Sequence, residues 1–539
     1  MKRKRATMKL VLACALTTAV LSGCSSGGGK GAGEGAEAKG VNATGFPIVQ
    51  EPVTVNAFAA KFFANADWNK LKLWQEYEKK TNIHINWETV QKDALKEKRN
   101  LLMASSGYPD LFYASAFSKS DLFKYGKQGV FLPLNEYIDQ YAPNLKALME
   151  KYPVIKKGIT MPDGKIYSLP TLYDPEFRSV FFNTPWVKTE WLTKLGLKEP
   201  ENLDEFAAML KAFKKGDPNG NGKPDEIAWG GVGTTGLVGY LRGAYGLGNH
   251  GNANQYVDTE PGSDKIRFIP ADPRYKEMLE YIHKLYKDGL LEQDIASVKS
   301  EEIDAKGTAG LLGIVDNVDP AAIYNQKGYA GLPVLKGPHG DQLYTYIGSP
   351  LGNIGMFILT DKAKNPAAMV RWMDYFYGEE GIKMFFMGWK DDTYKEESDG
   401  TVDYVDAIKN NKDGLSLDQA VSQYLIWPGG YYPGFVKQAY FKGAEGLPTS
   451  VANSKKADPH VLKPDQIWPA FNFTSEEQQE LTTLANDIET YVTEMRDKFI
   501  VGDAPLSQWD DYVATLNKMG LDRYKQIYQA ALDRYSKSS

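Results

Sequence analysis

The chain has 539 residues, of which 42% are hydrophobic, 24% are charged and 12% are aromatic, and its formal net charge is −5. This apolar content excludes a mainly disordered protein, and the length exceeds the roughly 100–200 residues of one domain. A weakly acidic chain is also a poor candidate for nucleic-acid binding, which needs a basic surface. The two cysteines and five scattered histidines provide neither a disulfide framework nor a zinc motif.

Residues 1–23 have the composition of an export signal, with a basic start and an apolar stretch that is shorter than the roughly 20 residues needed to span a bilayer. The signal ends in Leu-Ser-Gly-Cys, which resembles a bacterial lipobox with lipidation at Cys24; an ordinary signal peptide with an incidental cysteine is the alternative. Residues 24–45 are rich in Gly and Ala and predict a flexible tether. We therefore expect an extracytoplasmic protein that lipid on Cys24 anchors to the cell membrane.

Strand and helix patterns alternate from residue 53 onward. The first strands are predicted over 53–59, 84–90 and 109–115, and helices are predicted after Asp67 and over 93–105. This βαβαβ order is typical of a parallel sheet with helices on its faces, so the expected fold class is α/β.

The alternation continues through the rest of the chain. Further strands are predicted over 166–170, 179–183 and 352–359. Apolar residues at helical spacing, preceded by capping residues, predict helices over 202–214, from Asp272 to near Gly289, after Asn365 and over 474–499. Packing into a core explains these apolar stripes more simply than contact with a cofactor.

Residues 217–226 form a loop rich in oxygen donors. Its first six residues match the D-x-[DN]-x-[DN]-G start of a calcium loop, but position 12 of an EF-hand would be Ala228, so the acidic ligands must come earlier. A surface turn that needs no ion is the alternative. We predict a structural Ca²⁺ that holds this loop after helix 202–214. The expected ligands are Asp217, Asn219, Asn221, Lys223 through its carbonyl, Asp225 and Glu226.

The remaining motifs do not point to catalysis. Residues 246–251 match G-x-G-x-x-G, but they lack a preceding strand and an obvious following helix, so we interpret the match as a chance feature of a loop. The sequence contains no GxxxxGK[ST] and no GxSxG, and its many carboxylates do not single out a glycosidase pair.

Aromatic and polar residues occur together in several irregular segments. A sugar ring has an apolar CH face and a rim of hydroxyl groups, so its site needs flat aromatic surfaces and planar hydrogen-bonding groups. Each aromatic taken singly is better explained by core packing, whereas the group as a whole favours a saccharide site on loops. The candidates from this pattern are Tyr113, Ser115, Arg178, Trp229, Tyr240, Arg242, Trp427 and Tyr431.

The chain as a whole resembles extracellular solute-binding proteins, family 1, in the branch of long saccharide binders that carry a calcium loop and include the alginate-binding proteins. The resemblance lies in the lipobox, the βαβαβ opening, and the segments Gly-Tyr-Pro-Asp-Leu-Phe at 107–112, Asp-Gly-Lys-Ile-Tyr-Ser-Leu-Pro at 163–170 and Asp-Pro-Asn-Gly-Asn-Gly at 217–222. It covers essentially the whole mature chain, and the last two segments are its most specific parts.

The resemblance implies a two-lobed, type II periplasmic-binding-protein fold whose lobes are joined by hinge crossings. Lobe 1 is expected to comprise 46–170 plus 346–430, and lobe 2 171–345 plus 431–539 with the calcium loop. It also implies an oligosaccharide in the interlobe cleft, delivery to the permease of an ABC importer, a monomer, and no enzymatic activity. Ligand contacts are expected between Asp110 and Ser115, between Arg178 and Asn183, and at Asp316 and Asn317, where the tryptophan of the alginate binders is missing.

Two other functions remain open from the sequence. One is an anchored polysaccharide-degrading enzyme, which would release sugars from a polymer. The other is an adhesive or structural surface lipoprotein, which would bind no soluble ligand.

Overall fold

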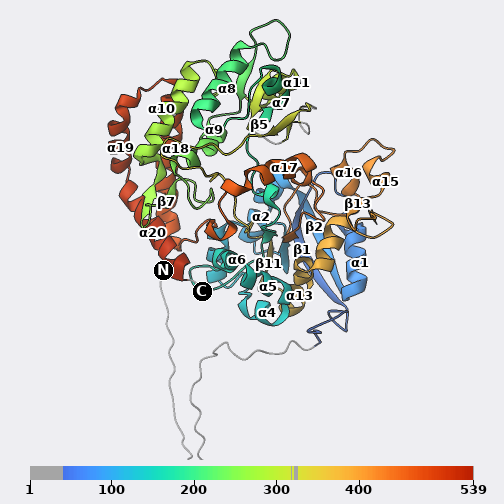
Figure 1. The fold of residues 1–539 in the computed structure, drawn as a ribbon. Helices are drawn as coiled ribbons and strands as arrows, with labels where there is room; N and C mark the ends of the chain where they lie inside the picture. The colour runs from blue at the N-terminus through green and yellow to red at the C-terminus, as the bar shows by residue number, and fades with distance from the viewer. Residues whose placement is uncertain (1–39, 317–318, 321–323, 325, 538–539) are drawn as a thin grey trace, which may run out of the picture. The chain divides into compact units, whose positions relative to one another are not determined.

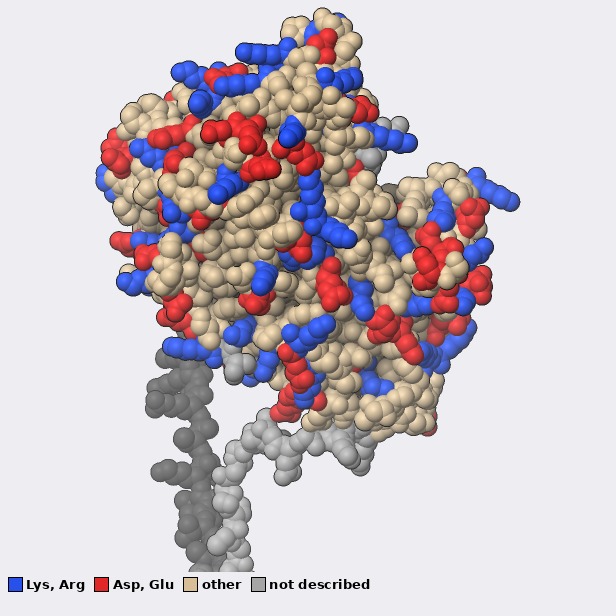
Figure 2. All heavy atoms as spheres, viewed as in Figure 1, with Lys and Arg blue, Asp and Glu red and all other residues tan. Residues whose placement is uncertain are grey.

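The computed structural model describes residues 40–316, 319–320, 324 and 326–537, and the chain from Gly40 onward forms one compact unit (Figure 1). The signal, Cys24 and most of the tether lie outside the described residues. Among the helices that are described, none combines the length and the apolar character needed to cross a membrane. Figure 2 shows basic and acidic side chains interspersed over the face in view.

The first sheet has the strand order β11-β3-β1-β2. Its strands are β1 (Val53–Lys61), β2 (Ile83–Gln91), β3 (Leu111–Tyr113) and β11 (Phe357–Leu359). β1 runs parallel to β2 and β3, whereas β11 is antiparallel to β3. The connecting helices are α1 (Lys72–Thr81) and α2 (Lys92–Ala104), which confirms the predicted βαβαβ opening.

The second sheet has the order β10-β5-β9-β6. Its strands are β5 (Trp186–Lys188), β6 (Ile227–Gly230), β9 (Leu312–Val315) and β10 (Tyr329–Gly331). β6 is parallel to β9, whereas β5 is antiparallel to both β9 and β10. The remaining strands form two-stranded pairs: β4 (Thr171–Tyr173) with β14 (Gly434–Val436), β7 (Val257–Thr259) with β8 (Ile266–Phe268), and β12 (Tyr394–Glu396) with β13 (Val402–Tyr404).

Four strand predictions are wrong or too long. The strand predicted over 109–115 shortens to β3. Residues 179–183 include a 3₁₀ turn, η2 (Arg178–Val180), in which the N–H of Phe181 bonds to the carbonyl of Arg178 at 3.0 Å instead of to a neighbouring strand. Residues 166–170 make only an isolated bridge from Leu169 to Phe357. Of the predicted strand 352–359, only β11 forms, because Gly355 adopts a φ of +66° against the backbone of Phe117.

The predicted long helices are confirmed as α8 (Leu203–Lys215), α10 (Pro273–Lys287), α13 (Pro366–Asp374) and α18 (Ser475–Val501). α18 begins with the predicted capping box, in which Thr474 and Glu477 satisfy each other's backbone N–H groups. The other helices are α3 (Lys119–Lys127), α4 (Asn135–Tyr141), α5 (Pro143–Lys151), α6 (Pro153–Ile159), α7 (Thr189–Lys194), α9 (Thr235–Leu241), α11 (Ser300–Thr308), α14 (Glu379–Met387), α15 (Asp406–Lys409), α16 (Leu417–Val421), α17 (Pro448–Ala457), α19 (Trp509–Lys518) and α20 (Leu521–Lys537). Figure 1 shows α10, α18, α19 and α20 side by side, and α18 contacts both α10 and α20.

Two large sets of buried side chains form separate cores. The first core draws on residues from Ile48 to Phe177 and from Leu351 to Val436, around the first sheet. The second draws on residues from Phe182 to Ile347 and from Ala457 to Leu532, around the second sheet. The chain therefore passes between the cores three times, near 177–182, 347–351 and 436–457. Residues 432–436 pack in the first core, although the sequence placed them with the second lobe.

Candidate functional site

The carboxyl ends of the parallel strands meet at one edge of each sheet. In the first sheet this edge follows β1, β2 and β3, and antiparallel β11 brings residues 353–356 to it. In the second sheet the edge follows β6 and β9, and antiparallel β5 brings the residues before Trp186 to it. Ligands of open α/β sheets bind at such carboxyl edges.

A cavity of about 510 Å³ lies where segments from these edges approach each other. Its volume falls within the roughly 300–1,000 Å³ of small-molecule sites. The first edge contributes Lys119, Asn353 and Ile354, and the second contributes Phe181. The other lining residues are Tyr173, Val180, Asn252, Ala253, Gly348, Ser349, Leu351, Gly352, Pro469 and Ala470. A second cavity, of about 290 Å³, is lined by residues of α6 and α20 and shares only Ala470 with the first.

Lys119 links the two cores at this cavity. Among the described residues that line it, Lys119 carries the one charged side chain. Its ammonium group donates to the carbonyl of Gly158 at 3.2 Å and to the carbonyl of Ala470. Burial of the ammonium group lowers the pKa of Lys119 to about 7, although the residue as a whole remains partly accessible.

Most of the predicted ligand residues around the first sheet are structural. Asp110 precedes β3 and accepts hydrogen bonds from the N–H and side-chain amide of Asn56, so it lies at the opposite, amino edge. Tyr113 and Ser115 are completely buried. Trp427 is also buried and donates to the Tyr404 hydroxyl at 3.0 Å.

Around the second sheet, Trp229, Tyr240 and Arg242 are buried as well. The rings of Trp229 and Tyr240 stack with their centres 6.1 Å apart. The Arg242 guanidinium donates to Thr345 and to the carbonyl of Gly251, and its burial lowers its pKa to about 10. These three residues stabilise the second core and do not face the cavity.

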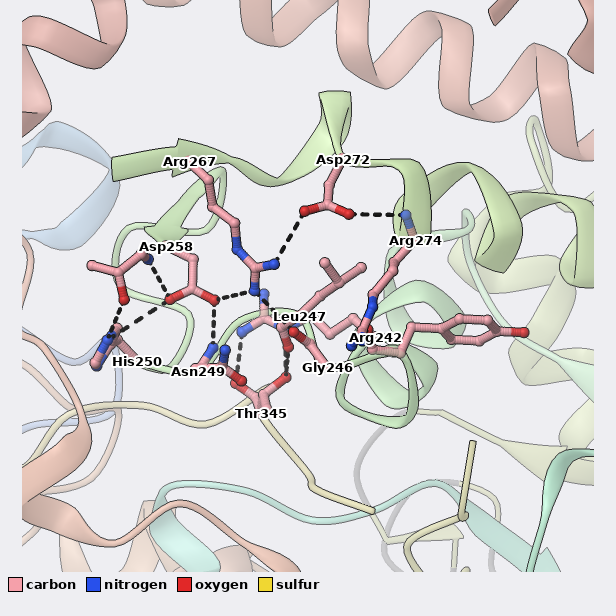
Figure 3. A network of polar contacts seen from close by, with 12 residues as sticks. Arg242, Gly246, Leu247, Asn249, His250, Asp258, Arg267, Asp272, Arg274 and Thr345 are labelled. Atoms are coloured by element: carbon pink, nitrogen blue, oxygen red, sulfur yellow. Dashed lines mark hydrogen bonds and ion pairs between the residues drawn. The ribbon is translucent and has the colours of Figure 1, made fainter. Parts of the chain in front are cut away.

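The G-x-G-x-x-G segment is part of the network that holds Arg242 (Figure 3). Gly248 has a φ of +78°, and a Cβ there would lie 2.6 Å from the guanidinium of Arg242. Beyond it, the buried Asp258 accepts from Arg267 at 3.0 Å and from the N–H of Asn249 at 2.8 Å. No strand of the structure directly precedes the segment, so it is a structural loop, as expected, and it leads directly into the cavity wall at 252–253.

Three of the predicted ligand residues, Arg178, Asn183 and Asp316, do lie close to the second edge. Arg178 and Asn183 have polar atoms without hydrogen-bond partners, and Asp316 has a carboxylate beside the end of a strand. Nη1 of Arg178 and Oδ1 of Asn183 are buried without a hydrogen-bond partner. Asp316 directly follows β9, and a Cβ at Gly231 would lie 2.6 Å from its carboxylate. Burial raises the pKa of Asp316 to about 7. Asn317 lies outside the described residues.

At the first edge, Tyr431 remains partly exposed, beside residues that the sequence pattern did not single out. Phe62 and Phe63 follow the end of β1, and Lys92 follows the end of β2. Phe63 is 66% exposed and Tyr431 is 36% exposed. Two consecutive aromatic residues directly after a parallel strand were the sequence signal that could have identified this group.

The predicted calcium loop is closed by its own side chains. The Asp217 carboxylate accepts from the N–H groups of Asn221 and Gly222, and the amides of Asn219 and Asn221 donate to Asp225. Within the described part of the chain, no three His, Cys, Asp or Glu side chains gather closely enough to hold a metal ion by themselves. An ion here would therefore need amide and carbonyl oxygens too, which calcium accepts.

Glu226 is the residue of this loop that best fits a bound cation. Its side chain is completely buried, and neither carboxylate oxygen has a hydrogen-bond partner. Burial raises the pKa of Glu226. The nearby backbone N–H groups of Glu226 and Asn219 oppose this shift, whereas the negative charges of Asp217 and Asp225 add to it. A buried carboxylate without a partner is unfavourable, and a divalent cation would satisfy it.

The family model for bacterial extracellular solute-binding proteins matches residues 63–383 of this sequence. The chain belongs to this family. It is 28% identical to the fructooligosaccharide ABC transporter substrate-binding protein FusA of Streptococcus pneumoniae, over 99% of both chains. It is also 26% identical to lipoprotein LipO of Bacillus subtilis, over 86% of this chain and 89% of LipO.

Solved structures of FusA superpose on this fold. FusA in complex with kestose and an EF-hand mutant of FusA in complex with fructo-nystose give TM-scores of 0.70 and 0.69. Each is 26% identical, over 90% of this chain and 99% of FusA. The expected two-lobed α/β fold and family are thereby confirmed, and this protein is a solute-binding protein rather than an enzyme.

Proposed function

We propose that this protein captures an oligosaccharide between its two lobes and delivers it to an ABC importer. The cavity of about 510 Å³ at the carboxyl edges of both sheets carries this proposal, because both cores contribute to its wall. FusA, the substrate-binding protein of a fructooligosaccharide transporter, supports the class of ligand.

The proposed lobes follow the two cores. Lobe 1 comprises residues 48–177 and 351–436, lobe 2 comprises 182–347 and 457–532, and the three segments between them act as the hinge. A ligand that contacts both lobes binds the closed arrangement more tightly than the open one and shifts the equilibrium toward it. The permease then recognises the closed form.

In lobe 2, the groups that we assign to ligand binding are Arg178, Asn183 and Asp316. An unpartnered guanidinium nitrogen, an amide oxygen and a carboxylate can together donate to and accept from sugar hydroxyl groups. The ligand would satisfy polar atoms that are buried without partners in its absence, and this favours binding.

Two further assignments concern the anchor and the ion. Lipid on Cys24 would hold the protein at the outer face of the cell membrane, with residues 24–40 as a tether. The tether ends earlier than the expected residue 45, because Val41 already pairs with Val49. A structural Ca²⁺ would be held by Glu226 and the oxygens of 217–225, and it would fix the loop that follows α8. The EF-hand mutant described for FusA supports a calcium loop in this group of proteins.

The function is tested by mass spectrometry of ligand that co-purifies with the protein, followed by small-angle scattering with the sugar identified. We expect an oligosaccharide that reduces the radius of gyration of a monomer. A tight ligand that leaves the radius unchanged would refute closure.

A further inference from the structure

An exposed aromatic group lies at the carboxyl ends of β1 and β2, outside the cavity already described. β1 ends at Lys61, and Phe62 and Phe63 follow directly. Their rings lie 4.4 Å apart, and 66% of Phe63 is accessible to solvent. Phe63 therefore contributes little to the core, and with Phe62 it presents an aromatic surface at the carboxyl edge, where ligands of open α/β sheets bind.

A second loop brings Tyr431 to the same place. A Cβ on Gly429 would lie 2.5 Å from the ring of Phe62, so the loop can approach this closely only with glycine at that position. Lys92 donates to the carbonyl of Gly429, and its ammonium group lies 4.4 Å from the centre of the Tyr431 ring. The loop 427–432 is therefore fixed against the ends of both strands.

The backbone of Tyr431 is strained. Its φ of +62° lies in the left-handed region, which is unfavourable for a bulky residue. The ring of Tyr431 is not packed in the core. It stays partly exposed, and the Lys92 ammonium group lies over it. Backbone strain of this kind persists mainly where it serves a function.

We propose that Phe63 and Tyr431, supported by Phe62 and Lys92, form a platform on which one ring of the captured saccharide stacks. The inference rests on the proposed oligosaccharide function. The CH face of a sugar fits the aromatic surfaces, and the Tyr431 hydroxyl and the Lys92 ammonium can bond to its hydroxyl groups. β1 and β3 are neighbours about 4.8 Å apart, so a ligand of several rings can reach this platform from the ends of β3 and β11.

Phe46 provides a matched control. It is 40% exposed, and the Lys80 ammonium lies 4.4 Å from its ring centre, as Lys92 does from Tyr431. Phe46 precedes the start of β1, at the opposite edge of the sheet. Its substitution removes a similar exposed ring and cation contact without touching the proposed platform.

The test is isothermal titration calorimetry with nystose, maltotetraose, cellotetraose, xylotetraose and trigalacturonate. For the probe that binds the wild type most tightly, we expect Phe63→Ala and Tyr431→Gly each to raise Kd about tenfold, and Phe46→Ala to leave it within twofold. Tyr431→Gly relieves the positive φ, so its Tm should equal or exceed that of the wild type while its affinity falls. If Tyr431 served only the fold, its substitution would not lower the affinity for the sugar while leaving Tm unchanged or raised.

The outcomes distinguish the platform from the function. If the wild type binds a probe and both variants match its Kd, the platform is overturned while the saccharide function stands. If the wild type binds neither these probes nor any sugar that co-purifies with it, the proposed function fails and the platform fails with it. A variant that loses affinity together with its thermal transition also counts against the platform, because the ring would then serve folding.

Discussion

Removing the calcium that we propose for the loop 217–226 should destabilise the part of the protein that surrounds α8 and β6. The buried Glu226 is the residue on which this expectation depends. The side chain is completely buried and both of its oxygens lack partners, so a bound cation is the group that can satisfy them. An ion that binds only the folded state stabilises it by about 2.7 kcal/mol at a hundredfold excess over Kd. For a lobe of this size, that free energy raises Tm by about 5–10 °C.

The assay is thermal unfolding in EDTA and in excess calcium, near neutral pH, for the wild type and two variants. Glu226→Gln keeps the shape of the side chain but removes its charge, so the calcium-dependent rise in Tm should disappear. In EDTA this variant should be at least as stable as the wild type, because it removes a buried charge without a partner. Lys223→Ala is the matched control, because its side chain is exposed and only its carbonyl is an expected ligand.

The reasoning is refuted if calcium leaves the Tm of the wild type unchanged, or if Glu226→Gln retains the full rise. Calorimetric titration with calcium supplies a second measurement, in which we expect one site in the wild type and in Lys223→Ala. If Lys223→Ala abolished calcium binding while Glu226→Gln retained it, the Glu226 carboxylate would not be a ligand of the ion.

Three further predictions concern the second edge and the cores. Between about pH 4 and 7 the folded chain keeps a proton on Asp316 that the unfolded chain releases, so stability falls as pH rises through this range; denaturation at several pH values should show a flatter profile for Asp316→Asn. Trp229→Ala should lower the free energy of unfolding by about 3–5 kcal/mol in urea, because it leaves a cavity in the second core. Tyr113→Phe removes a buried hydroxyl without a partner, so it should leave stability unchanged or raise it by about 1 kcal/mol, with unchanged sugar affinity by calorimetry.

Local sequence signals predicted the long elements well. The apolar spacing and caps of α8, α10 and α18 act within a few residues, so they can be recognised without tertiary contacts. The strand predicted over 179–183 failed because a strand needs a partner, and this segment lies where the chain crosses between the cores. The aromatic and apolar residues of segment 179–183 have the composition of a strand, and this composition is the same whether or not another strand pairs with the segment.

The candidate site was harder to predict, because exposure is decided by distant contacts. Trp229, Trp427 and Phe63 all lie near the ends of strands or in loops, yet the sequence pattern selected the two tryptophans and passed over Phe63. The structure buries both tryptophans among residues far away in the chain and leaves Phe63 exposed. Composition can therefore predict that a protein binds sugars, but it cannot predict which of its aromatic residues are exposed to bind them.

The polar groups of the second edge would bind a ligand through hydrogen bonds, whereas the exposed aromatic residues of the first edge would bind it by stacking. Nη1 of Arg178 and Oδ1 of Asn183 are buried without partners, and each such atom destabilises the folded protein by about 1–3 kcal/mol. Arg178 already bonds through Nε to Asp458 at 2.6 Å, so its guanidinium is held in place while one nitrogen stays free. Because both atoms are buried, a ligand reaches them only when neighbouring groups move aside, and its hydrogen bonds then restore the free energy that the unpartnered groups withhold. Affinity at this edge should therefore depend on hydroxyl geometry, whereas affinity at Phe63 and Tyr431 should depend on the sugar face.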